Sequence, residues 1–299
     1  MAHSLFDKRA VLVTGKGGVG KTTLVAALAR AAAKEGKRVL VAEVATSGDY
    51  HSPLASLFGL TRFAREPLQL TEDIWGAILL AQVGQERFME DKIRSRRLAK
   101  AALSSKAVQT LLATAPSARE MGILYHLLSE FRKERRGEPA YDLIIVDMPA
   151  TGHALGLTSL PSVLLKLFGD GPIYDTLRSG QEIFCDATLT QAIVVSLPEP
   201  LAVQEALELI AGLDRDNVAV GATVVNQMTS APFSLAEKTL LEEATLGKNY
   251  LGRHTLSRSS LSKQAVARLR ANTSIPMIEV PRFAFGNVVT EIANSLVAS

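Results

Sequence analysis

The chain has 299 residues, of which 47% are hydrophobic, and its formal net charge is +3. This length and composition allow a large apolar core in one domain or in two modest ones. The small net charge gives no reason to expect a polyanionic partner, so nucleic acid is disfavoured as a ligand. The single cysteine, Cys185, excludes a disulfide framework and a site built from several thiolates, such as a cysteine-bound zinc.

Neither a targeting segment nor a membrane span is expected. The first residues, MAHSLFDKRA, contain no apolar stretch of the kind a signal peptide needs. No uncharged apolar run reaches the ~18 residues that cross a bilayer. We therefore expect a cytoplasmic protein without an integral membrane segment. Because Ile183 and Phe184 precede Cys185, this thiol is expected in the packed core.

Short apolar runs alternate with helical patterns along the chain. The runs lie at 11–14, 38–44, 74–80, 143–147, 192–197, 218–226 and 277–280. The fourth run is apolar on both faces, as a central parallel strand should be. Strands that alternate with helices predict right-handed βαβ units, and hence an α/β fold with a doubly wound, mostly parallel sheet.

Longer helical patterns flank the run at 143–147. Residues 86–114 and 117–136 are predicted as helices, and 154–184 form a further apolar helical tract. We expect one domain, 1–299, with a helical subdomain inserted at about 85–136 and 154–185. Its apolar stripes pack either internally or around a groove. The candidate groove residues are Met89, Ile93, Met121, Leu124, Leu128, Leu164 and Phe168.

A glycine-rich loop follows the first apolar run. Residues 15–22 read GKGGVGKT, which fits G-x-x-x-x-G-K-[ST] between a buried strand and a helix. In such a loop Lys21 reaches the β- and γ-phosphates, and the Thr22 hydroxyl binds Mg²⁺ at a helix N-terminus. The motif predicts a bound nucleoside triphosphate. The expected binding residues are Gly15, Lys16, Gly17, Gly18, Val19, Gly20, Lys21, Thr22 and Thr23.

An acidic residue, Asp147, ends the fourth apolar run. An acid that leaves a buried strand beside a phosphate loop holds a water ligand of Mg²⁺, so Thr22 and Asp147 are the predicted metal-site residues. The turn that follows reads DMPATGH, and its Gly152 can sense the γ-phosphate through the backbone. His153 has either a role in this turn or a structural one.

The loop carries an extra lysine, Lys16, and this residue is the basis of a resemblance to a known family. GKGGVGKTT resembles the deviant Walker A motif of the arsenite-pump and GET (ArsA-like) ATPases and of the partition and septum-site ATPases. VDMPATGHALGLTSLP is similar to switch II of the arsenite-pump and GET branch, and partition ATPases lack its T-G-H. Residues 224–227 and 280–283 resemble two later motifs. The resemblance implies a P-loop NTPase fold, ATP and Mg²⁺ as ligands, and base contacts from Asn226, Pro281, Arg282 and Phe283.

The same resemblance implies an assembly and a client. It suggests a homodimer, or a heterodimer with a paralogous chain, in which Lys16 reaches the partner's nucleotide. Related ATPases use the helical region to shield a client's transmembrane helix, so a hydrophobic or protein client is expected. A lone cysteine disfavours a metalloid pump. The expected catalytic residues are Lys16, Lys21 and Asp49.

The switch I segment departs from the family pattern. The family's Asp that orients or activates the attacking water aligns with Ala45, and a later polar residue aligns with Asp49. We therefore expect slow hydrolysis, unless Asp49 has taken the role. One alternative is a regulatory nucleotide-binding partner of a paralogous ATPase. Another is a partition or positioning ATPase, against which the absence of Lys and Arg from 286–299 argues.

Overall fold

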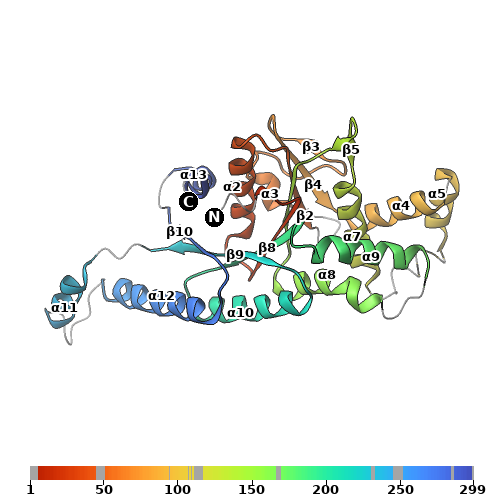
Figure 1. Cartoon of the computed structure of the whole chain (residues 1–299). Coiled ribbons are helices and arrows are strands. Elements are labelled where there is room, and N and C mark those ends of the chain that lie inside the picture. The colour runs from red at the N-terminus through yellow and green to blue at the C-terminus, as the bar shows by residue number, and fades with distance from the viewer. Residues whose placement is uncertain are drawn as a thin grey trace.

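The computed structural model is built on an eight-stranded sheet with the order β10-β9-β8-β1-β7-β2-β4-β3 (Figure 1). It describes residues 6–44, 51–93, 95–106, 108, 110, 117–165, 170–229, 233–244, 252–283 and 286–297. The strands are β1 Ala10–Gly15, β2 Val39–Val44, β3 Leu68–Gln69, β4 Ile74–Leu79, β7 Leu143–Asp147, β8 Thr190–Ser196, β9 Val220–Met228 and β10 Met277–Pro281. All pairs are parallel except β3 with β4. The predicted α/β fold with a mostly parallel sheet is confirmed.

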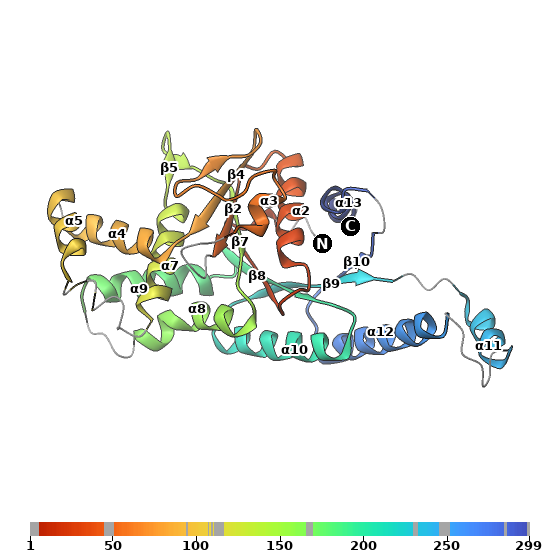
Figure 2. The ribbon, with the colours of Figure 1, turned by 180° about the vertical axis from the view of Figure 1, so that it is seen from behind.

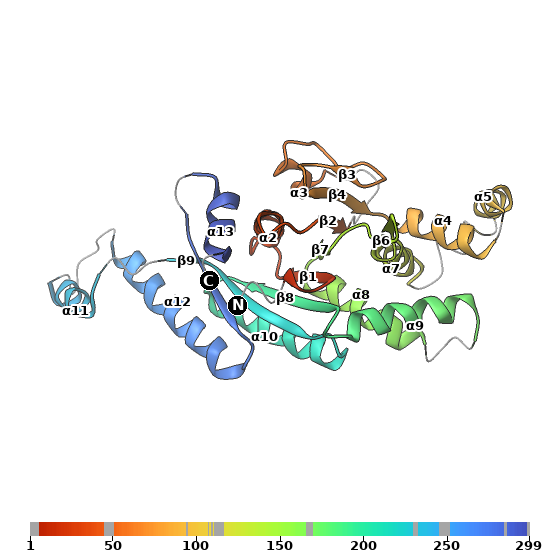
Figure 3. The ribbon, with the colours of Figure 1, turned by 45° about the horizontal axis from the view of Figure 1, so that its top comes forward.

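Helices cover both faces of the sheet (Figures 2 and 3). One face carries α2 (Lys21–Lys34), α3 (Pro53–Ser56) and α13 (Val288–Val297). The other carries α7 (Ala118–Phe131), α8 (Thr151–Leu164), α9 (Pro172–Cys185), α10 (Pro200–Arg215) and α12 (Gly252–Asn272). The remaining helices, α4 (Ala81–Lys92) and α5 (Arg96–Ser104) at one end and α11 (Leu235–Ala244) at the other, extend beyond the sheet (Figure 1).

The central strands are apolar on both sides because helices bury both faces. Along β7, Ile145 packs into the cluster with α2, while Ile144 and Val146 pack into the cluster with α7, α8 and α10. Every residue of β1, β2 and β7 is buried. Burying one such aliphatic side chain stabilises the fold by about 1.5–3 kcal/mol. Because both faces are buried, these strands are continuous apolar runs, which the sequence identifies as strands.

Two helix predictions were wrong in their extent. The region expected as one helix at 86–114 contains two: α4 begins five residues earlier and ends at Lys92, where Ile93 adopts extended backbone angles, and α5 follows at Arg96–Ser104. The helix expected at 117–136 ends at Phe131 and is followed by a small hairpin, β5 (Glu134–Arg135) and β6 (Glu138–Pro139). Left-handed angles at Arg136 and Gly137 form its turn. The edge strand β3 was also not predicted.

Within the described part of the chain, no helix combines the length and apolarity needed to cross a bilayer.

Candidate nucleotide site

The glycine loop at the end of β1 is shaped by what lies under it. β1 is paired with β7 and β8, so its carboxyl end opens at the centre of the sheet. A Cβ at Gly15 would lie 2.2 Å from the Val195 carbonyl oxygen, and a Cβ at Gly20 would lie 2.3 Å from Asn226 Nδ2. Gly20 also has a φ of +94°, in the left-handed region. Side chains are therefore excluded from the loop where it contacts the sheet.

The N-terminus of α2 brings a lysine and a hydroxyl to this loop. Lys21 Nζ donates to the carbonyl oxygens of Gly15 and Lys16, at 3.1 and 3.0 Å. Burial lowers the pKa of Lys21, although the Asp147 carboxylate opposes this shift. The helix dipole and the first N–H groups of α2 favour an anion at the same place. This end of the helix can therefore bind phosphate.

Two acidic residues lie side by side at the carboxyl ends of β7 and β2. Asp147 accepts a 2.6 Å hydrogen bond from the Thr22 hydroxyl, and its register partner on β2 is Glu43. Burial raises the pKa of Asp147 to about 6, and the Glu43 charge adds to this, while Thr22 and Lys21 act against it. The pairing of a hydroxyl with a buried carboxylate fits a Mg²⁺ ion held by few protein oxygens.

Glu43 was not identified as a site residue from the sequence. Its side chain is 3% exposed and accepts a hydrogen bond from the Ser52 hydroxyl, which also caps α3 by accepting from the Ala55 N–H. A charged residue inside an otherwise apolar strand was the available signal, because burying an acid is costly without hydrogen bonds or a cation. Glu43 belongs to the acidic end of the site.

The extra lysine of the loop contacts a distant helix of the same chain. Lys16 Nζ lies 2.8 Å from Glu205 Oε1 on α10, 189 residues away in sequence. Both side chains are about one third exposed. No sequence pattern pointed to Glu205, since nothing local links it to the loop.

The residues expected to contact a base lie at β9 and β10. Asn226 Nδ2 donates to the Val19 carbonyl oxygen at 2.8 Å, so this amide braces the phosphate loop from below. The Arg282 N–H donates to the Met228 carbonyl oxygen, which ties the end of β10 to β9. Phe283 is half-buried against the cluster around α2 and α13, and Pro281 is exposed. Base recognition by these residues stays a prediction.

The remaining predicted site residues either lie at helix starts or fall outside the described residues. Thr23 is half-buried in the first turn of α2, and the backbone of Gly152 lies in the first turn of α8. Ala45 and the proposed catalytic residue Asp49 lie outside the described residues. The structure thus gathers Lys16, Lys21, Thr22, Asp147 and Asn226 around one loop and leaves Asp49 a prediction.

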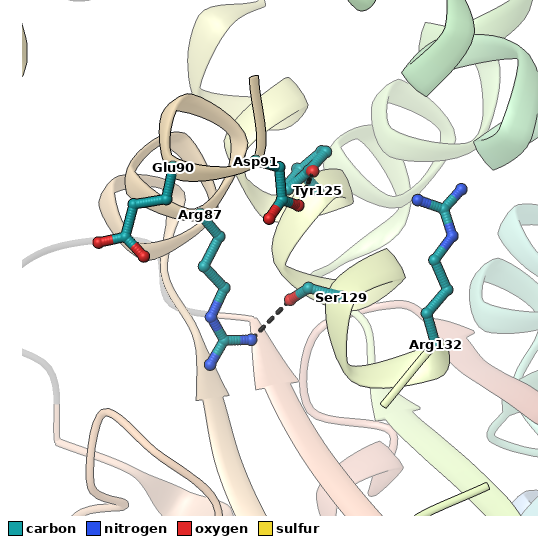
Figure 4. Close-up of a pocket in the computed structure, with 6 residues that line it drawn as sticks. All are labelled: Arg87, Glu90, Asp91, Tyr125, Ser129 and Arg132. Atoms are coloured by element: carbon teal, nitrogen blue, oxygen red, sulfur yellow. Dashed lines mark hydrogen bonds between the residues drawn. The ribbon is translucent and has the colours of Figure 1, made fainter. Parts of the chain in front are cut away.

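The residues predicted to line an apolar groove do not form one continuous exposed surface among the described residues. Leu124 and Leu128 are fully buried in the core, whereas Met89, Ile93 and Met121 are half-buried. Phe168 and the side chain of Leu164 lie outside what the structure describes. Between α4 and α7 there is a polar cavity of about 260 Å³ (Figure 4). Its lining residues are Arg87, Glu90, Asp91, Tyr125, Ser129 and Arg132.

The cysteine is only partly buried. Cys185 ends α9, and its thiol donates to the Asp216 carbonyl oxygen at 3.5 Å. Partial burial raises the pKa of this thiol. The thiol was expected in the packed core, and the structure instead leaves it partly buried at the C-terminal end of α9.

A glycine loop pressed onto a parallel sheet and opening at a helix N-terminus is how P-loop proteins hold phosphate. The chain falls into this class of α/β proteins. Residues 8–170 match the model of the family described as anion-transporting ATPases. The chain belongs to this family.

Several curated proteins are similar to the chain. ATPase BagA of Mycobacterium tuberculosis is 30% identical over 223 residues, covering 72% of this chain and 64% of that protein. The putative arsenical pump-driving ATPase 1 of Aquifex aeolicus is 25% identical over 74% of this chain and 63% of its own length. ATPase GET3 of Kluyveromyces lactis is 25% identical over 75% and 73%. The chain spans slightly less than two thirds of the length of the BagA relative.

Proposed function

We propose that the protein is a Mg²⁺-dependent ATPase that converts ATP and water to ADP and phosphate. The observation that carries the proposal is the 2.6 Å pair of Thr22 and Asp147 beside Lys21, at a loop whose contacts exclude side chains. The family and the names of the relatives support the same activity.

In this proposal four residues have defined roles. They are Lys21, Thr22, Asp147 and Gly152. Lys21 leaves the Gly15 and Lys16 carbonyl oxygens for the β- and γ-phosphates, which are stronger acceptors for an ammonium group. Thr22 and Asp147 would hold Mg²⁺, directly or through water. The bound Mg²⁺ would neutralise charge that develops on the phosphate oxygens. The backbone of Gly152 follows Asp147 closely enough in sequence to report the γ-phosphate to α8.

The proposed working form is a dimer that ATP closes. In it Lys16 contacts the nucleotide of the other protomer, which is either a second copy or a paralogous chain. Because Ala45 replaces the expected acid, we propose that turnover is slow, or that Asp49 orients the water. Ala45 also favours a second candidate function, a nucleotide-binding partner that regulates a paralogous ATPase and hardly hydrolyses ATP itself.

We further propose that α4 and α5 contact a hydrophobic protein client. Leu98 on α5 is 64% exposed, and Ile93 between the two helices is half-exposed. An exposed leucine on a projecting helix offers apolar area without serving the core. Leu98→Ser is expected to leave thermal unfolding unchanged and to weaken ATP-dependent capture of a peptide that contains a transmembrane helix. Unaltered capture by this variant would argue against α5 as the contact.

Calorimetry on ATP binding tests the main proposal. Lys21→Ala should weaken ATP binding at least about tenfold, because a charge-assisted phosphate contact is lost. Lys34→Ala is the matched control, since Lys34 lies at the far end of α2 and contacts Asn294. Asp147→Asn should retain metal-free ATP binding and lose the gain that Mg²⁺ gives. Equal affinities of Lys21→Ala and Lys34→Ala would overturn the proposal.

Turnover separates the two candidate functions. Phosphate release by the wild-type chain should be slow, well under ~1 s⁻¹. An increase with Ala45→Asp would support a damped switch, and abolition by Asp49→Asn would assign the water to Asp49. No release by the chain alone, with release restored by a paralogous chain, would support the regulatory partner.

A further inference from the structure

The Lys16–Glu205 ion pair joins the phosphate loop to α10 within one chain. We propose that Glu205 is a positioning residue that holds Lys16 in a resting, same-chain contact until bound nucleotide releases it. The inference rests on the proposed function, because it assumes that Lys16 acts on the nucleotide of a partner. It assigns to α10 a role in controlling when the dimer closes.

The contact directs the lysine to its own chain. Lys16 Nζ lies 2.8 Å from Glu205 Oε1, a charge-assisted distance. A phosphate bound to another protomer must therefore compete with the Glu205 carboxylate for this ammonium group. Neutralising Glu205 removes the competitor while leaving Lys16 intact.

The helix does not need this pair to stay in place. α10 is held on the sheet by buried apolar residues, among them Val203, Ala206 and Leu209. Lys16 and Glu205 are 35% and 29% exposed, and pairs in contact with solvent contribute little to folding and weaken with salt. A contact of this strength can be broken by a phosphate without disturbing the fold.

A second lysine, Lys21, couples release of the Lys16 side chain from Glu205 to nucleotide binding. Lys21 Nζ donates to the Lys16 carbonyl oxygen at 3.0 Å, so Lys16 is held by its backbone through Lys21 and by its side chain through Glu205. A phosphate in the loop draws Lys21 away from that carbonyl oxygen. Lys16 then loses its backbone contact with Lys21 and keeps only the side-chain contact with Glu205, which favours release of the side chain only after the loop is occupied.

The same-chain contact is tested without nucleotide. Acetylation of Lys16 by an N-hydroxysuccinimide ester, followed by mass spectrometry, should be at least about twofold faster in Glu205→Gln than in the wild type. Glu208→Gln is the matched control, because Glu208 is exposed on the same helix and pairs with Gln204. Labelling of Lys16 at equal rates in both variants would overturn the inference.

The functional consequence is tested by sedimentation with ATP-γ-S. Glu205→Gln should lower the protein concentration that gives half-maximal dimer by about two- to fivefold. This difference from the wild type should become smaller at high salt. In a Lys16→Ala background the same substitution should have no effect, which a merely structural role of Glu205 would not produce. A weaker dimer in Glu205→Gln would overturn the inference and assign Glu205 to the closed dimer instead.

The outcomes distinguish this inference from the proposed function. If the wild-type chain neither binds ATP-γ-S nor dimerises, the proposed function fails, and the release role proposed for Glu205 fails with it. If the wild-type chain dimerises and Glu205→Gln matches Glu208→Gln in both assays, the inference fails and the proposed function stands.

Discussion

The phosphate-loop edge and the α4–α7 region both bury charged side chains, but they neutralise them differently. Between α4 and α7, the fully buried Glu130 carboxylate contacts Arg87 at 2.6 Å and Lys133 at 3.4 Å. At the loop edge, Asp147 and Glu43 accept hydrogen bonds from hydroxyl groups, and Lys21 rests on carbonyl oxygens. Opposite charges are in contact around Glu130 in the first region, whereas Asp147 and Lys21 in the second contact neutral groups.

Histidine 126 strengthens this contrast. His126 is fully buried on α7, and its Nδ1 accepts a hydrogen bond from the Leu80 N–H. Burial, with the Arg87 charge, lowers the pKa of His126 to about 4, so this ring is neutral at physiological pH. The α4–α7 region thus pairs the Glu130 charge internally but leaves the Nε2 atom of His126 buried without a hydrogen-bond partner among the described residues, whereas the loop edge retains groups that can exchange protein contacts for a ligand. We therefore expect the first arrangement to serve stability and the second to serve binding.

The largest expected effect breaks the charge network between α4 and α7. Arg87→Met should lower the free energy of unfolding by about 3–5 kcal/mol, because Glu130 is left buried with a weaker partner. Urea unfolding measures this. Arg178→Met is the control, since the Arg178–Glu182 pair is exposed on both sides, and its loss should change stability little. Equal losses would show that the buried Glu130 pair contributes no more to folding than an exposed ion pair does.

A smaller effect is expected from the close crossing of the same helices. A Cβ at Gly84 on α4 would lie 1.7 Å from the Gly122 carbonyl oxygen on α7, so Gly84→Ala forces the backbones apart. Overpacking of this kind costs about 1–3 kcal/mol in unfolding free energy. Gly156→Ala on α8 is the matched control, because its Cβ would meet nothing within 4 Å. That variant should instead gain up to about 1 kcal/mol from helix propensity.

The smallest expected effect has the opposite sign and concerns the loop edge. The raised pKa of Asp147 means that its contribution to stability is present below the unfolded pKa of 3.8 and is lost as pH rises through about 6. Asn does not ionise, so Asp147→Asn should be more stable than the wild type by about 1–2 kcal/mol at pH 7.5 and nearly equal to it at pH 4.

Urea unfolding at the two pH values checks this difference. Glu72→Gln on an exposed turn is the control and should show no comparable trend. If Asp147→Asn were less stable than the wild type at pH 7.5, the carboxylate would serve the fold rather than the ligand. The contrast between the two regions would then disappear.

Much of the central architecture was determined by the sequence alone. The runs that form β1, β2 and β7 are apolar at nearly every position, and burial on both faces of a parallel sheet requires this pattern. The glycine loop was equally readable, because its residues are adjacent in sequence. Even the proximity of Thr22 and Asp147 followed from the rule that parallel strands bring their carboxyl ends to one edge.

Only the tertiary structure decided which surfaces meet. The helical spacing of Leu124 and Leu128 was correct, but periodicity shows that one face of a helix is apolar and not what covers it. The hairpin at 134–139 depends on two residues with left-handed angles, and one of them is an arginine without a turn signature. The Lys16–Glu205 pair joins residues 189 apart, so it exists only because the sheet places α10 beside the loop. Local patterns fix elements and motifs, whereas contacts between distant polar side chains arise from the packing of the whole chain.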